Sequence, residues 1–390
     1  MAADAVLVRP RSLAAAIAPL TAGHLGTDLA QGALPALLPY LATRFHLSYL
    51  QVGVIVLCST VANSIVQPVF GHWSDSRGAT WLLPAGPLTA GIGIGLLAIA
   101  PSYPAAIGCV IVSGIGVAAY HPEATKHAAW IARDRPSTAM SLFSIGGNLG
   151  VAIGPLLAGV AAAHYGLHGA ALLVIPAALV SALMFASLPR LAIDGVAGER
   201  RAAEAPPAAH VRELMILLWA VAARGYVYTG LVSFIPLLEQ RVRHHGASHG
   251  SRVLTLLLAT GAAGTLVFGP LADRVGRQRM LFWSFVLCVP ATALYLSDSG
   301  LLGLVGLAVA GACLVSSFGV TIVLSQEYLP GRMGMAAGLS IGLSIGLGGI
   351  AAICVGALAD TFGLTAALWT TPLGALAGAL LTLLLPSDSR

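Results

Sequence analysis

Residues 301–323 read LLGLVGLAVAGACLVSSFGVTIV, a run of 23 residues without one charged side chain. A membrane-spanning helix needs about 20 predominantly apolar residues, so this run alone predicts a transmembrane segment. The whole chain has the same character, because 57% of its 390 residues are hydrophobic and only 9% are charged, whereas average soluble domains carry roughly 25% charged residues. The apolar blocks are continuous, unlike the alternating strands of about ten residues in a membrane barrel. The sequence therefore predicts a polytopic, all-α membrane protein.

Apolar blocks separated by short polar loops predict twelve transmembrane helices. The expected spans are about 13–42, 49–71, 79–100, 104–130, 137–163, 169–189, 212–238, 253–272, 279–297, 301–327, 332–359 and 364–386. The longest polar stretch contains GERRAAEAPPAAH at 198–210, and this composition is typical of a flexible linker. We therefore predict two pseudo-symmetric six-helix bundles, at 1–189 and 212–390, joined by a cytoplasmic linker at 190–211.

The basic residues predict the orientation and exclude two classes of function. With the N-terminus inside, 15 of the 20 lysine and arginine residues fall in cytoplasmic segments and four in outer loops, so the positive-inside rule predicts that both termini are cytoplasmic. The arginines are scattered between apolar blocks, so no nucleic-acid partner is expected. Lys126 is the only lysine and no Gly-Lys pair exists, which excludes a Walker phosphate loop. No cofactor and no resident metal are expected.

Two loops of similar sequence lie about 198 residues apart. Gly71-His-Trp-Ser-Asp75-Ser-Arg77-Gly78 follows the second span, and Gly269-Pro-Leu-Ala-Asp273-Arg274-Val-Gly276-Arg277 follows the eighth. Duplicated six-helix units are typical of transporters that rock around a central site. The second loop resembles the G-x-L-A-D-R-x-G-R hallmark of the major facilitator superfamily, and the first loop departs from it. An aspartate at a helix end can pair with arginines or with a helix N-terminus, so Asp75, Arg77, Asp273, Arg274 and Arg277 are expected to act in gating.

Four further strings lie in the first half of the chain: Gly23-His24…Asp28…Gln31-Gly32…Leu34-Pro35…Leu38-Pro39, Gln67-Pro68, Tyr120-His121-Pro122-Glu123-Ala124, and Ser141-Leu-Phe…Gly146-Gly147-Asn148…Gly154-Pro155. Together they resemble the fosmidomycin-resistance branch of that superfamily. The resemblance implies a monomeric, multi-pass transporter of the bacterial inner membrane. It also implies export of small toxic compounds or antibiotics, fosmidomycin-like and including anionic ones, in exchange for protons.

Ionisable side chains inside the bilayer mark candidate proton-coupling residues, because each costs at least about 2.5–3.5 kcal/mol there. His24 and Asp28 are four residues apart in the first span and share a helix face, which Gln31 extends. This face is expected to line the central cavity, with Asp28 as proton carrier or substrate contact. The alternative is an interhelical hydrogen bond that only fixes packing.

The fourth span offers a second candidate group, His121 and Glu123 with Lys126 one turn on. Pro122 removes a helix hydrogen bond and should loosen the span locally. Glu123 beside His121 and Lys126 is expected to bind and release a proton, and the alternative is a structural Glu–Lys pair. Glu327, at the end of the tenth span, is the approximate counterpart of Glu123 in the second half, and a gating or structural role is expected for it.

Arg224 lies in the middle of the seventh span, where a permanent cation needs an anionic partner. Either it neutralises Asp28 or Glu123, or it receives an anionic substrate, which suits its guanidinium. Weaker candidates for substrate contacts are Asn63, Gln67, Lys126, Asn148, Tyr226 and Tyr228. Span five resembles the drug–proton antiporter signature around Gly154-Pro155, and a glycine–proline pair can bend a span, so these two residues are expected to form a hinge.

Two alternatives stay open within transport. Divalent metal export is one, because the histidines and carboxylates of the first and fourth spans could converge on a cation. Proton-coupled uptake of an anion or nutrient is the other, because one sequence does not fix the direction of transport. An enzyme is not expected, since the chain has no nucleophile elbow, no metal motif and no sizeable soluble domain.

Overall fold

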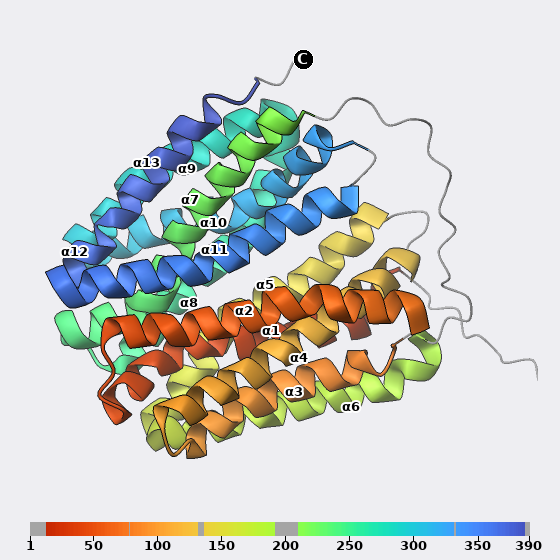
Figure 1. Cartoon of the computed structure of the whole chain (residues 1–390), viewed down its shortest axis with the longest axis horizontal. Coiled ribbons are helices and arrows are strands. Elements are labelled where there is room, and N and C mark those ends of the chain that lie inside the picture. The colour runs from red at the N-terminus through yellow and green to blue at the C-terminus, as the bar shows by residue number, and fades with distance from the viewer. Residues whose placement is uncertain (1–12, 78, 132–135, 192–209, 331–332, 387–390) are drawn as a thin grey trace, which may run out of the picture.

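The computed structural model describes residues 13–77, 79–131, 136–191, 210–330 and 333–386, and these residues form helices joined by short turns (Figure 1). The elements are α1 (Leu13–Arg44), α2 (Tyr49–Arg77), α3 (Leu82–Leu96), η1 (Leu97–Ile99), α4 (Tyr103–Ile131), α5 (Pro136–Tyr165), η2 (Gly166–Leu173), α6 (Val174–Leu191), α7 (Val211–Leu237), η3 (Leu238–Val242), α8 (Ala247–Val275), α9 (Arg277–Ser297), α10 (Leu301–Tyr328), α11 (Met333–Phe362), α12 (Leu364–Leu368) and α13 (Thr370–Thr382). The predicted all-α class is confirmed. Every predicted span has helix in its place, although some ends differ by several residues.

Ten described segments are long and apolar enough to cross a membrane, so the chain is a multi-pass membrane protein. One of them, Met140–Pro189, runs through α5, η2 and α6. Helix α1 is not among the ten; it is diluted by His24, Asp28, Gln31 and three prolines. Twelve spans and cytoplasmic termini therefore stay predictions.

The helices pack as two sets. In the first set α1 packs on α5, α4 on α2 and α3, and α6 on α3; in the second, α10 packs on α8 and α9, and α13 on α7 and α9. The most extensive contacts between the sets form two seams, α2 against α11 and α5 against α8, and α1 also contacts α7 and α8. We propose that these two sets correspond to the two predicted bundles and move relative to each other.

The α2–α11 seam is tight at one end only. We name the end at which α6 ends and α7 begins the linker end, and the opposite end the distal end. In Figure 1, α2 and α11 lie side by side at the distal end and diverge toward the linker end. Small residues permit the close approach: a Cβ on Gly53 would overlap the Ala352 carbonyl, and one on Gly356 would overlap the Tyr49 carbonyl.

Polar contacts also join the two sets at the distal end. The Asp360 carboxylate of α11 accepts the backbone N–H groups of Tyr49 (2.8 Å) and Leu50 (2.9 Å). Asp360 therefore caps the first turn of α2, and its charge complements the positive end of that helix. Nearby, Arg241 of η3 donates to the Leu47 carbonyl and lies over the Tyr49 ring. We name the two Asp360 hydrogen bonds the distal latch.

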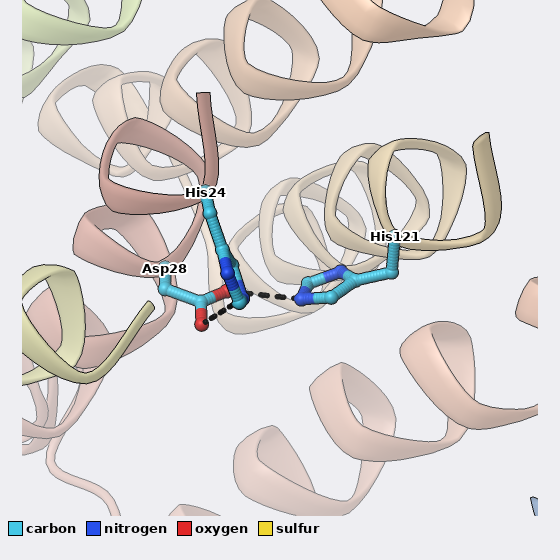
Figure 2. A group of neighbouring side chains, drawn as sticks. All are labelled: His24, Asp28 and His121. Carbon is cyan, nitrogen blue, oxygen red and sulfur yellow. Dashed lines mark ion pairs between the residues drawn. The ribbon is translucent and has the colours of Figure 1, made fainter. Parts of the chain in front are cut away.

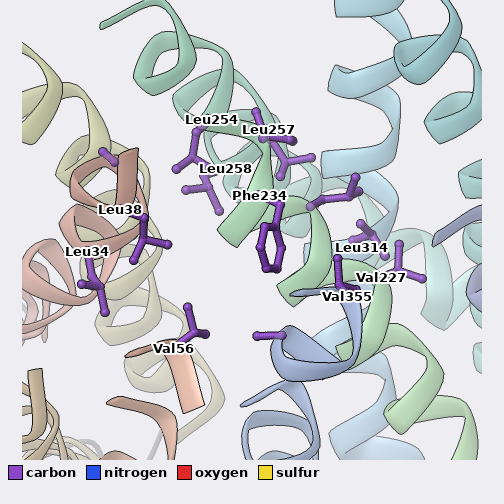
Figure 3. Close-up of a cluster of buried hydrophobic side chains, with 14 of the residues drawn as sticks. Leu34, Leu38, Val56, Val227, Phe234, Leu254, Leu257, Leu258, Leu314 and Val355 are labelled. Carbon is purple, nitrogen blue, oxygen red and sulfur yellow. The ribbon is translucent and has the colours of Figure 1, made fainter. Parts of the chain in front are cut away.

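Between the helix sets, buried apolar side chains form the core that Figure 3 shows. They come from α1, α2, α7, α8, α10 and α11, and include Leu34, Leu38, Val56, Val227, Phe234, Leu254, Leu257, Leu258, Leu314 and Val355. Leu34 and Leu38 lie about 9 and 15 Å beyond Asp28 along α1, at 1.5 Å per residue. The acidic group of α1 is thus separated from the distal end by packed hydrocarbon.

Candidate functional site

Three ionisable side chains meet between α1 and α4 (Figure 2). His24 Nε2 lies 3.2 Å from one carboxylate oxygen of Asp28, and His121 Nε2 lies 3.4 Å from the other. The side chains are between 11% and 20% exposed. We name His24, Asp28 and His121 the histidine–aspartate trio. An unpaired carboxylate buried to this extent would be costly, so each member depends on the other two.

Backbone carbonyls fix which nitrogen of each imidazole faces Asp28. His24 Nδ1 lies 2.9 Å from the Phe143 carbonyl oxygen, and His121 Nδ1 lies 2.8 Å from that of Val117. A carbonyl oxygen only accepts, so each Nδ1 carries hydrogen, and the Nε2 of a neutral ring then bears a lone pair. A lone pair facing a carboxylate oxygen is repulsive unless a proton lies between them. The trio is therefore arranged to hold up to two exchangeable protons, one at each Nε2–oxygen contact.

Packing holds the trio in place. The His24 ring stacks on Phe143 of α5 at 4.2 Å between centroids, and the Tyr120 hydroxyl of α4 donates to the Leu20 carbonyl of α1. Gly147 of α5 passes so close that a Cβ there would overlap the His24 ring and press on the Asp28 carboxylate. Gly154 passes equally close to the α1 backbone. The small residues of α5 thus allow α1 to bring the trio against α4 and α5.

Glu123 occupies a separate centre between α2 and α4. It is 1% exposed, accepts a short hydrogen bond from the Ser74 hydroxyl, and lies 3.4 Å from His127 Nδ1. Lys126 donates to the carbonyl oxygen (2.9 Å) and the hydroxyl oxygen of Ser74. Glu123 was expected to act beside His121, but residues two apart face different sides of a helix. The structure places His121 on Asp28 and His127 on Glu123.

Arg224 lies in an aromatic pocket of the second helix set. It is 1% exposed, and its guanidinium carbon lies 3.5 Å from the centre of the Phe318 ring, a close cation–π contact. Tyr228, one turn along α7, meets the same ring edge-on at 6.3 Å. Tyr228 and Arg224 of α7 therefore share the Phe318 ring of α10.

The remaining predicted polar residues are spread over several places. Gln31 and Asn63 line a small cavity of about 30 Å³ between α1, α2, α3 and α4, together with hydroxyl side chains of Ser59, Thr60 and Ser113. Asn148 donates to the Thr265 hydroxyl at 3.5 Å across the α5–α8 seam. Tyr226 is hydrogen-bonded to Thr370, within the second helix set. Gln67 is half-buried on α2.

The predicted gating residues of the second half meet at the linker end. Arg277 pairs with Asp273 at 3.1 Å, one turn away, and with Glu327 at the end of α10. The ion pairs tie the junction of α8 and α9 to α10. Arg274 is exposed. The side chains of Asp75 and Arg77 lie outside the described residues.

A family model described as the Major Facilitator Superfamily matches residues 20–339 of the chain. The chain belongs to the Major Facilitator Superfamily. Two relatives span nearly the same length. YfnC of Bacillus subtilis (strain 168), described as an uncharacterised transporter of this superfamily, is 32% identical over 376 residues, which are 94% of this chain and 91% of YfnC. The fosmidomycin resistance protein of Escherichia coli (strain K12) is 30% identical over 355 residues, which are 87% of this chain and 85% of that protein.

Solved structures share the superfamily fold at low sequence identity. A bacterial homologue of the human lysosomal transporter Spinster, inward-facing and unoccupied, superposes with a TM-score of 0.81 at 14% identity, covering 96% of this chain and 97% of its own. A mutant of the nucleoside transporter NupG superposes with a TM-score of 0.79 at 12% identity, covering 94% and 99%. The family match confirms the predicted family, and the Escherichia coli relative confirms the predicted resemblance to a fosmidomycin resistance protein. Membership in a transporter superfamily supports a transport role rather than an enzyme.

Proposed function

We propose that this superfamily member exports small, acidic toxic compounds from the bacterial cytoplasm in exchange for protons. The observation that carries the proposal is the buried histidine–aspartate trio, in which two imidazole nitrogens face the oxygens of one carboxylate. The likeness to the fosmidomycin resistance protein supports this class of substrate. The positive-inside pattern, with the linker end cytoplasmic, supports the inner membrane.

Coupling follows from competition for the same lone pairs. With Nδ1 of each histidine held by a carbonyl, a proton can leave only through the Nε2–Asp28 contacts. Once it has left, a lone pair is free to accept an O–H or N–H group of the substrate. Proton and substrate therefore exclude each other at the trio, as exchange requires. Arg224, beside Tyr228, would bind the acidic group of the same compound.

The distal latch and the apolar core support a form closed at the distal end. In this form the substrate would enter from the linker end, and the latch would break when the chain opens to the outside. A proton entering across 100 mV contributes about 2.3 kcal/mol, which corresponds to a gradient of roughly fifty-fold because 1.4 kcal/mol is a factor of ten. Five glycines permit the close packing of α1 against α5, namely Gly32, Gly146, Gly147, Gly150 and Gly154.

A pump-deficient bacterium that expresses the chain tests this function. Fosmidomycin tolerance should rise several-fold with the wild type and fall to the empty-vector level with Asp28→Asn or Arg224→Ala. Asp298→Asn is the matched control, because Asp298 lies in the turn between α9 and α10, outside both centres. No rise in tolerance to fosmidomycin or any other acidic compound, with the protein present in the membrane, would refute the proposal.

Divalent metal export is a second candidate because the trio itself is a possible ligand set. One ligand atom from each of His24, Asp28 and His121 lies within 4.8 Å of the others, and imidazole with carboxylate suits nickel, cobalt or zinc. Carbonyls on the outer ring nitrogens also match the orientation of metal-binding histidines. In this case the wild type should protect the same bacterium against metal salts but not against acidic antibiotics.

A further inference from the structure

A second cluster of ligand-forming side chains lies at the distal end of the second helix set. Here α7 passes into the π-helical turn η3, and α8 begins five residues later. Glu239 of η3 is 1% exposed, whereas the His245 and His249 side chains are 38% and 36% exposed. Glu239 is 15 residues beyond Arg224, about 22 Å along the helix. The cluster therefore lies apart from Arg224 and is a site separate from the trio.

The three side chains converge on one point. Oε2 of Glu239 lies 2.7 Å from His245 Nδ1 and 3.6 Å from His249 Nε2, and the imidazole rings are 4.6 Å apart. All three ligand atoms lie within 4.8 Å of one another. In a tetrahedral zinc site with bonds of 2.0–2.1 Å, ligand atoms are about 3.4 Å apart. Shifts of less than about 1 Å in the exposed imidazoles would meet this geometry.

The carboxylate is oriented by groups on its far side. Its other oxygen, Oε1, accepts from the Tyr295 hydroxyl (2.7 Å) and from Arg243 Nη1 (2.8 Å), and Arg243 also donates to the Tyr295 carbonyl. Oε2 is left facing the two histidines. The His245 backbone N–H donates to the Glu239 carbonyl at 2.8 Å, which fixes the turn that carries the first imidazole. Hydrogen bonds of this kind, made by groups around the ligands, orient the ligand side chains of metal sites.

We infer that Glu239, His245 and His249 form a distal binding site for a divalent transition-metal ion such as Zn²⁺. Two imidazoles and one carboxylate select zinc, nickel or copper over magnesium and calcium, which prefer oxygen ligands. Three protein ligands leave a fourth position for water, and the exposed histidines give access to it. The ion would take the place of the hydrogen between His245 and Glu239. Arg243 offsets the glutamate charge, so the affinity is set mainly by the imidazoles.

Zinc titration of the purified, detergent-solubilised full chain by isothermal calorimetry tests the site. The double variant His245→Ala/His249→Ala should lose one bound ion per chain relative to the wild type. His244→Asn is the control: His244 is an exposed neighbour at φ 56°, a conformation that asparagine tolerates, and this variant should bind as the wild type does. His24→Gln should also retain the distal ion, which separates this site from the trio.

The zinc affinity of a Tyr295 variant tests the site independently, because Tyr295 orients Glu239 without contacting the ion. Tyr295→Phe removes the outer hydrogen bond but no ligand, and should weaken zinc binding by about 10- to 100-fold. Its thermal unfolding in detergent reports whether the fold is intact. A wild-type chain that binds no zinc here, or a double histidine variant that binds as many ions as the wild type, would overturn the inference; the cluster would then be a structural ion-pair network.

Discussion

The distal latch makes a quantitative prediction about the conformational equilibrium. Asp360 accepts two backbone N–H groups at the first turn of α2, across the seam between the helix sets. Replacing such a cap by alanine costs about 0.5–2 kcal/mol. Since 1.4 kcal/mol is a factor of ten, this range corresponds to a factor of about 2–30. Asp360→Ala should therefore shift the population toward distal-open forms by about that factor. Asp360→Asn keeps an acceptor and loses about 0.3–1 kcal/mol of charge–dipole attraction, so its shift should be smaller.

Distances between two spin labels, measured by double electron–electron resonance, report this shift in population. Spin labels at Gln51 of α2 and Thr361 of α11, both exposed near the latch, would report the closed and open populations in a chain freed of its native cysteines. Asp298→Asn is the control, because Asp298 accepts backbone N–H groups of Gly300 and Gly303 at the same end but within one helix set. Unchanged distances in Asp360→Ala, or an equal shift in the control, would refute the reasoning.

Four further predictions concern the two acidic centres, the buried arginine and the Asp298 cap. Gly147→Ala should abolish transport by displacing the trio, whereas Gly108→Ala, with open space at its Cβ, should not; initial transport rates decide. Glu123→Gln should lower thermal stability, since a hydrogen bond to a charged group contributes about 1.5–3 kcal/mol, yet leave proton coupling intact, and lost coupling would contradict the division into two centres. Arg224→Lys keeps the positive charge but loses the planar stack on Phe318. It should weaken the apparent affinity for acidic compounds by less than Arg224→Ala does. Equal losses of affinity in the two variants would count against anion binding by Arg224. Backbone hydrogen bonds from Gly303 and Gly300 lower the pKa of Asp298. The ionised Asp298 should therefore stabilise the first turn of α10 above about pH 4, and this stabilisation should be lost at lower pH. Hydrogen exchange at the Gly303 amide measures the stabilisation, and Asp298→Asn should remove its pH dependence.

The positions of the helices were predicted well because each helix depends mainly on the residues within its own segment. Residues 301–323 are apolar throughout, and the structure has α10 there. His24 and Asp28 were expected on one face because four residues make about one helical turn, and His24 Nε2 lies 3.2 Å from the Asp28 carboxylate. The superfamily followed from motifs, and the family match confirmed it.

Contacts between distant helices could not be read from spacing. His121 reaches Asp28 and Ser74 reaches Glu123 only because α4 packs against α1 and α2. Asp360 gave no local signal either, since its partners are backbone groups 310 residues away in the chain. One signal was available and missed: Glu123 and His127 are four residues apart, as His24 and Asp28 are.

Transport driven by a pH gradient in proteoliposomes, compared with counterflow in the same vesicles, tests the role of the trio most directly. Counterflow needs only substrate binding and alternating access, whereas transport of the substrate against its concentration gradient also needs exchange with protons. With labelled fosmidomycin as the probe, the wild type should do both, and Asp28→Asn should retain counterflow but lose uphill movement. An Asp28→Asn variant that still concentrates fosmidomycin under the imposed gradient would contradict proton coupling at the trio.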